Sequence, residues 1–133
     1  MTLNARSLKN LEGVHPDLCK VVHKADDLAE IAGLGFIITE GCRTYKRQQE
    51  LVAAGASQTM KSRHIPGTNG FGHAIDFAPL IAGTISWKWP AFTPLVALFK
   101  QASKSMNIPI ECGADWLTFK DGPHIQLPWA KYP

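Results

Sequence analysis

Two short stretches of the sequence contain the residue types that bind metal ions. The first spans residues 62–77 and contains His64 and, within an apolar segment, Asp76. The second spans residues 120–127, where turn residues are followed by His124 and alternating apolar positions. A catalytic zinc ion commonly takes three ligands of these types and leaves a fourth position for water. The three side chains therefore form a candidate metal site.

Two further residues have the chemistry that a hydrolytic site requires. Asp121 precedes His124 by three residues across a Gly-Pro turn, so its carboxylate is expected to accept a proton from the attacking water and pass it to a leaving amine. Arg43 follows a predicted strand, and its planar donors suit a substrate carbonyl or an oxyanion. Asp121, Arg43 and Asp76 each have a simpler alternative: Asp121 occupies a turn position that Asp favours, Arg43 is a surface cation paired with a nearby acid, and Asp76 is a cap or pairs with an arginine.

The elements that must position these residues can be predicted from periodicity and turn signals. In the first part of the chain we expect a short helix that stops near Gly13, a helix over Pro16–Ala32, a strand over Gly35–Gly41, a helix over Tyr45–Ala54 capped by Thr44, and a long loop over Ala56–Gly72. In the second part we expect a strand over Ala74–Ile81 broken by Pro79, a hairpin around Gly83, a helix that begins at Thr93 and Pro94, and strands over Ile108–Gly113 and His124–Leu127. This order predicts an α+β fold, with a small antiparallel sheet flanked by helices.

Composition limits the class of protein. The chain of 133 residues is 45% hydrophobic, which predicts one globular domain over residues 1–133. The net charge of +3 is mild, and no nucleic-acid-binding motif is present. No apolar run is long enough to cross a bilayer. The N-terminus has no apolar segment typical of a signal peptide, so we expect synthesis in a cytoplasm.

The three cysteines, an odd number, exclude a complete disulfide framework. We expect them to be reduced and buried. A cysteine hydrolase that uses Cys42 beside Arg43 is an alternative, but a buried cysteine at a strand end is the better interpretation. Trp87 and Trp89 flank Lys88, and they either line a groove or, as we prefer, cover the edge of the core.

A family resemblance is visible in the same residues. The Ser-x-His…Gly-x-Ala-x-Asp signature of the LAS zinc metallopeptidases resembles the pattern of Ser62, His64, Gly72, Ala74 and Asp76. Residues 40–48 look like the family's Gly-x-Arg-Ser/Thr…Gln segment. Residues 121–126, Asp-Gly-Pro-His-Ile-Gln, resemble the end of phage endolysins that cut L-alanyl–D-glutamate bonds. The resemblance covers nearly the whole chain, from His15 to Leu127.

The resemblance implies a function and a role for each site residue. It implies the hedgehog/D-Ala-D-Ala peptidase fold and a monomeric phage endolysin that hydrolyses peptidoglycan stem peptides at the L-alanyl–D-glutamate bond, reaching the cell wall after release. The alternatives are a D-alanyl-D-alanine carboxypeptidase and an inactive wall-binding module. The implied roles are zinc binding by His64, Asp76 and His124, acid/base catalysis by Asp121, and substrate and transition-state contact by Arg43, helped by Ser62 and Gln48.

One feature departs from the compact form of the family. His64 and Asp76 are twelve positions apart, which is more than the compact form has, and we expect the extra residues, 66–71, to form a longer loop over the cleft. His73 is then a second candidate ligand. Residues three apart on a strand point to opposite faces, so we assign the ligand role to His64 and expect His73 to lie in the loop or to support the site.

Overall fold

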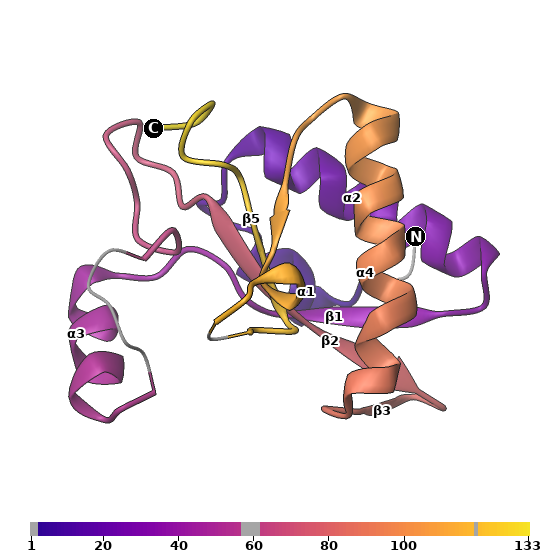
Figure 1. Cartoon of the computed structure of the whole chain (residues 1–133). Coiled ribbons are helices and arrows are strands. Elements are labelled where there is room, and N and C mark those ends of the chain that lie inside the picture. Colours follow the sequence, from indigo (N-terminus) through magenta and orange to yellow (C-terminus); the bar gives the residue numbers. More distant parts are fainter. Residues whose placement is uncertain (1–2, 57–61, 119) are drawn as a thin grey trace.

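An antiparallel sheet forms the centre of the molecule, as a computed structural model shows (Figure 1). The structure describes residues 3–56, 62–118 and 120–133. Its strands are β1 (Gly35–Glu40), β2 (Ala74–Ile81), β3 (Thr84–Ile85), β4 (Glu111–Cys112) and β5 (His124–Gln126). Its helices are α1 (Ala5–Asn10), α2 (Pro16–Ile31), α3 (Tyr45–Ala53), α4 (Trp89–Met106) and the 3-10 turn η1 (Gly113–Asp115). The order β1-β2-β5-β4, with β3 paired to β2, confirms the predicted fold class.

One face of the sheet is buried in the hydrophobic core. Helices α2 and α4 contribute apolar stripes to this core, and β1 and β2 contribute Phe36, Ile38, Ile75 and Phe77. The rings of Phe77 and Phe99 lie 4.9 Å apart between centroids, and each buried ring of this kind contributes about 1.5–3 kcal/mol. Because alternate strand residues face opposite sides, the core positions on β2 direct the side chain between them, that of Asp76, to the other face.

Helix α1 covers the outer edge of the sheet at β1. The Ile38 N–H donates to Ser7 Oγ at 2.9 Å, and Asn10 Nδ2 donates to the Ile38 carbonyl oxygen at 2.8 Å. Ser7 and Asn10 therefore satisfy the backbone N–H and C=O of Ile38, which would otherwise be open to a neighbouring strand. This protects the edge of the sheet from pairing with another chain.

Pro79 does not break β2, contrary to the prediction. The strand continues to Ile81, and Pro79 pairs with Phe36 of β1. Its carbonyl oxygen accepts from the Ser86 N–H on the opposite side, at 3.0 Å. A strand residue directs its N–H and C=O to the same neighbour, so the N–H that proline lacks would point toward the β3 side, where β3 has already ended. The β1–β2 ladder therefore loses no hydrogen bond.

Helix α4 begins earlier than predicted, at Trp89 rather than after Thr93. Pro90 occupies the first turn, where a missing N–H costs nothing, and Pro94 lies inside the helix. Two prolines each suited a helix start, and the sequence alone favoured the wrong one. The strand expected over Ile108–Gly113 is also shorter, because only Glu111 and Cys112 pair with β5. Helix α1 ends at Asn10, three residues before the predicted stop near Gly13, and the remaining elements lie within two residues of their predicted bounds.

Among the described helices, none is long and apolar enough to span a membrane.

Candidate metal centre and active site

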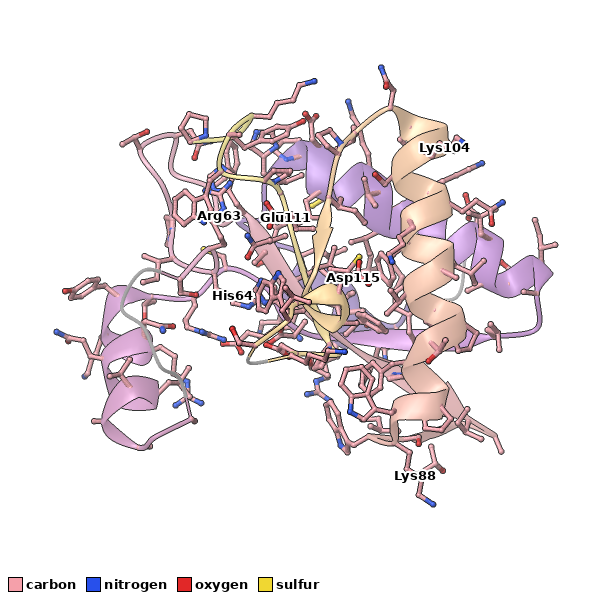
Figure 2. The ribbon with its side chains drawn as sticks, in the orientation of Figure 1. Arg63, His64, Lys88, Lys104, Glu111 and Asp115 are labelled. Carbon is pink, nitrogen blue, oxygen red and sulfur yellow. The ribbon has the colours of Figure 1, made fainter. Side chains whose placement is uncertain are left out.

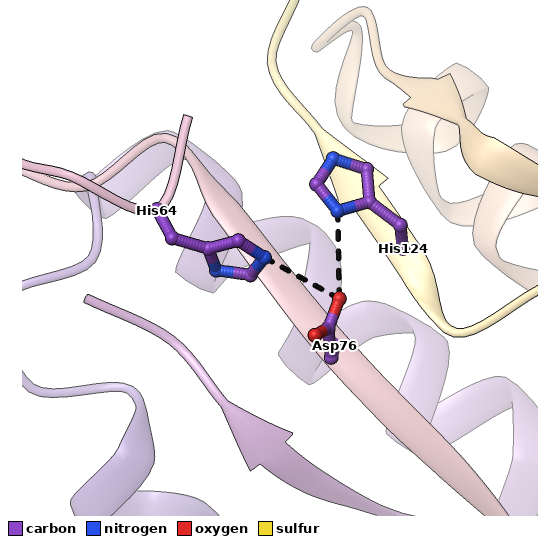
Figure 3. A group of neighbouring side chains, drawn as sticks. All are labelled: His64, Asp76 and His124. Atoms are coloured by element: carbon purple, nitrogen blue, oxygen red, sulfur yellow. Dashed lines mark ion pairs between the residues drawn. The ribbon is translucent and has the colours of Figure 1, made fainter. Parts of the chain in front are cut away.

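Three of the predicted site residues converge on the open face of the sheet. Asp76 on β2 lies directly opposite His124 on β5 in the antiparallel register, so both side chains share a face. His64 reaches them from the loop before β2 (Figure 3). His64 Nε2 and His124 Nδ1 each lie 3.4 Å from Asp76 Oδ1. All three atoms lie within 4.8 Å of one another, so they are able to hold a metal ion. We call His64, Asp76 and His124 the metal group.

Neighbouring acceptors fix the orientation of both imidazole rings. His64 Nδ1 lies 2.8 Å from the Gly41 carbonyl oxygen, and His124 Nε2 lies 2.7 Å from Gln126 Oε1. A ring nitrogen next to an oxygen acceptor carries the hydrogen, which leaves the other nitrogen with a lone pair. In each ring that other nitrogen is the one that faces Asp76. Gln126 was missed by sequence reasoning, although its alternation with His124 on β5 was a usable signal.

The two separations from Asp76 Oδ1 fit a tetrahedral metal ion. Zinc–ligand distances of about 2.0–2.1 Å place neighbouring ligands about 3.4 Å apart in a tetrahedron, which matches both separations from Asp76 Oδ1. That oxygen is buried and has no hydrogen-bond partner among the described residues. A buried carboxylate oxygen without a partner is costly, so a cation among the three atoms accounts for an otherwise unexplained group.

Protons and a metal ion compete for this group. Burial by itself raises the pKa of Asp76, but the rings of His124 and His64 outweigh burial and hold that pKa well below its usual range. Burial lowers the pKa of His124, but Asp76 and Gln126 outweigh it and raise that pKa above its usual value. Because a protonated imidazole cannot coordinate, metal affinity should weaken as the pH falls.

Asp121 lies in the turn that leads into β5, next to the metal group. Its N–H donates to the Gly113 carbonyl oxygen at 3.1 Å, and its own carbonyl oxygen accepts from the His124 N–H at 3.2 Å. A Cβ at Gly113 would lie 2.3 Å from the Asp121 carbonyl oxygen, so only glycine lets η1 approach this turn. Burial, and then the charge of Asp76, raises the pKa of Asp121, whereas a bound dication would act in the opposite direction.

Arg43 is held in place by two side chains. Its Nε and Nη2 donate to the carboxylate of Glu40 at 2.7 and 2.6 Å, and its Nη1 donates to Gln48 Oε1 at 2.6 Å. Within the described residues these contacts use three of the five N–H groups of the guanidinium. No described residue accepts from the other two N–H groups, which are the donors that a substrate would need. The Arg43 N–H also donates to the His64 carbonyl oxygen at 2.7 Å, which joins the arginine to the metal group.

Comparisons with known proteins agree with this geometry. The family model of the phage L-alanyl-D-glutamate peptidase matches residues 1–127. The chain belongs to this peptidase family. It is 39% identical over 114 residues to the L-alanyl-D-glutamate peptidase of Escherichia phage T5, covering 83% of this chain and 77% of the relative. A peptidase of the same name from a Listeria phage is 32% identical over 96% of this chain, which spans 43% of that longer protein.

A solved structure resembles this peptidase closely. The L-Ala D-Glu endopeptidase ChiX of Serratia marcescens has a TM-score of 0.85 and 41% sequence identity, over 97% of this chain and 91% of the other. The peptidoglycan L-alanyl-D-glutamate endopeptidase CwlK of Bacillus subtilis is 30% identical, over 86% of this chain and 75% of that protein. The fold class and the peptidase activity expected from the sequence are thereby confirmed.

Two residues predicted to contact the substrate, Gln48 and Ser62, both form hydrogen bonds to other residues of the site. Gln48 is fully buried and accepts from Arg43, so its side chain positions the arginine rather than reaching the surface. Ser62 is half-buried, and its Oγ accepts from the His64 N–H at 3.2 Å. Glu40 was not predicted to be part of the site, although it is the first residue of the family-like segment 40–48 and lies three residues before Arg43. An acid at that spacing was the available signal.

Cys42 is exposed, which corrects the expectation that it is buried. At the end of β1, Gly41 and Arg43 are buried, so the residue between them faces solvent. Cys112 is buried as predicted, Cys19 is partly buried, and all three are free. Cys42 is also not a member of the metal group.

His73 lies under the long loop and outside the metal group. It is 1% exposed, its Nε2 lies 3.1 Å from Asn69 Nδ2, and its ring centroid is 5.5 Å from that of His15. The amide donates, so Nε2 accepts and the hydrogen lies on Nδ1. In the described part of the loop, residues 66–71 fold over this histidine rather than over the metal group. Residues 57–61 lie outside the described part.

We predict that His73 makes the stability of the peptidase depend on pH. Burial, then Arg63 and His15, lower its pKa from 6.5 to about 4. Between these values the unfolded chain binds the extra proton, so stability falls as the pH falls, by about 3 kcal/mol in full. His73→Gln should flatten the urea-unfolding free energy between pH 7 and pH 4.5 relative to the wild type. Parallel pH profiles of the two proteins would contradict this assignment.

Proposed function

We propose that the protein is a zinc-dependent peptidoglycan hydrolase, a phage endolysin, that cleaves the L-alanyl–D-glutamate bond of stem peptides. The observation that carries the proposal is the buried, unpartnered Asp76 Oδ1, which faces one oriented lone pair from His64 and one from His124. Two imidazoles and one carboxylate are a donor set that suits a catalytic zinc ion. The relatives are L-alanyl-D-glutamate peptidases, one of them a peptidoglycan endopeptidase, and this supports the proposed bond and polymer.

The proposed site divides the reaction among its residues. His64, Asp76 and His124 hold the zinc ion, which when bound supplies Lewis-acid chemistry and makes a water molecule acidic enough to attack near neutral pH. Asp121 accepts the proton of that water as its oxygen bonds to the alanyl carbonyl carbon. The same carboxyl group then gives the proton to the glutamyl nitrogen as the carbon–nitrogen bond breaks.

Arg43 stabilises the charge that develops during this reaction. Its two remaining N–H donors suit the oxygen of the tetrahedral intermediate or a carboxylate of the substrate. Glu40 and Gln48 fix the guanidinium before the substrate arrives, so its orientation costs no further entropy during reaction. We assign Ser62 to the same wall of the site, where it positions His64.

Mass spectrometry of digested peptidoglycan tests the choice of bond. We expect new peptides that begin with D-glutamate, released by the zinc-loaded protein and not by the Asp121→Asn variant. The matched control is Asp115→Asn, which removes an exposed acid paired with Lys100 and should leave the products unchanged. Loss of only a terminal alanine would instead identify a D-alanyl-D-alanine carboxypeptidase. Absence of any new amino group would identify an inactive wall-binding module.

A further inference from the structure

Two exposed tryptophans form an aromatic platform at the start of α4. Trp87 is 61% exposed and Trp89 is 50% exposed, although we expected both to cover the core edge. Each indole packs against buried Phe92, with centroid distances of 6.3 Å. They therefore contact the core edge but leave about half of their surface to solvent. Exposed apolar groups gathered in one patch mark binding surfaces in soluble proteins.

The platform is defined as Trp87, Lys88 and Trp89. It borders the turn that contains Asp121, which we call the catalytic turn. A Cβ at Gly122 would lie 3.4 Å from Trp89 Cζ3 and 3.4 Å from Phe92 Cγ. Gly122 follows Asp121 directly, so this indole adjoins the proposed acid/base. Lys88 extends outward from the N-terminal end of α4 (Figure 2), where it precedes the first helical residue. A ligand that leaves the metal group past Asp121 therefore meets an aromatic surface with a cation.

The chemistry of the proposed substrate requires a sugar near the scissile bond. This step rests on the proposed function. In peptidoglycan the L-alanine is joined through a lactyl group to a pyranose ring of the glycan strand. One residue and one lactyl group span at most about 7 Å when extended. The glycan must therefore lie on the protein surface immediately beside the site.

We propose that the platform is a binding subsite for the glycan strand, with the two indoles packing on pyranose faces and Lys88 facing a carboxylate of the anionic polymer. Tryptophan suits this ligand, because it offers a rigid apolar face with a polar N–H at its edge. Contact with Phe92 holds both rings in place before binding, which reduces the entropy lost on association.

A second aromatic surface competes for this role. Trp129 is 42% exposed and lines a cavity of about 290 Å³ with Tyr45 and Arg63. However, the Arg63 guanidinium lies 4.0 Å from the centre of the Trp129 ring, so one face of this indole is already covered. The platform keeps more open aromatic surface and adjoins the catalytic turn, so we assign the glycan to it.

The test compares two substrates with the same stem peptide, one free and one joined to its disaccharide. Trp87→Ala and Trp89→Ala should each lower kcat/KM for the disaccharide-linked substrate by roughly tenfold and leave kcat/KM for the free peptide unchanged. Trp89→Tyr should recover most of the loss. Equal losses on both substrates would reduce the platform to a structural role and overturn the proposal. So would unchanged kinetics, or a selective loss in Trp129→Ala alone.

A binding measurement separates this proposal from the proposed function. Glycan strands stripped of peptide contain no bond for the peptidase to cut, so their binding to the zinc-loaded protein, measured by calorimetry, does not depend on catalysis. Roughly tenfold weaker binding by Trp87→Ala and Trp89→Ala supports the subsite even if the cleaved bond proves to be a different one. Equal binding by wild type and both variants overturns it even if the bond is confirmed.

Discussion

Asp121→Asn is expected to keep the metal ion and to lower kcat by about 10²–10⁴-fold, the usual contribution of a general acid–base group. Asparagine has nearly the same shape and also suits a turn, so the backbone bonds of the turn to Gly113 and His124 should persist. The amide cannot take a proton from water. The measurement pairs turnover of a free stem peptide with the metal content per chain.

This substitution separates a catalytic role from a structural one. If Asp121 only shaped the turn, the asparagine variant would keep nearly full activity. If it were a ligand, the variant would lose metal. Thermal unfolding of the zinc-loaded variant should match that of the wild type, because the metal group and the Gly113 contact are untouched. Loss of metal in Asp121→Asn would therefore contradict the assignment.

The metal group was predictable because strand pairing follows from simple patterns. Alternation on β2 puts Asp76 on the face opposite Ile75 and Phe77, alternation on β5 puts His124 opposite Ile125, and antiparallel pairing then makes Asp76 and His124 neighbours. His64 was harder to place, since it sits in a loop without periodicity. Its position depends on long-range bonds to Gly41 and Arg43. The family signature, together with the three-residue spacing that argues against His73, singled it out.

The features that sequence reasoning missed depend on three-dimensional partners. Pro79 is tolerated only because its missing N–H would face away from β1, a detail of register. Cys42 is exposed because its neighbours occupy the buried side. Glu40 binds the guanidinium of Arg43, and its spacing of three residues from Arg43 gains this meaning only once the fold brings Arg43 next to the metal group. In each case the three-dimensional arrangement decides what the sequence pattern leaves open.

Because activity depends on this geometry, we expect removal of a metal-binding side chain to cause the largest loss of activity. His124→Ala should lose both the metal ion and activity, the latter by more than about 10³-fold, because a bound metal supplies several kcal/mol of transition-state stabilisation. Only His64 and Asp76 would remain, and Asp76 would lose half of the contacts that keep it ionised. Chelation of the wild type should reproduce the loss of activity, and added zinc should reverse it.

His73→Gln is the matched control, because it changes a buried histidine that lies three residues from Asp76 but outside the metal group. It should bind zinc with wild-type stoichiometry near neutral pH, whereas His124→Ala should not recover at any zinc concentration that restores the stripped wild type. Since Asp76 and Gln126 raise the pKa of metal-free His124, zinc affinity of the wild type should also fall as the pH falls. A chelated wild type that retained full peptidase activity would refute the metal centre, and a His73→Gln protein without zinc would transfer the ligand role to the loop.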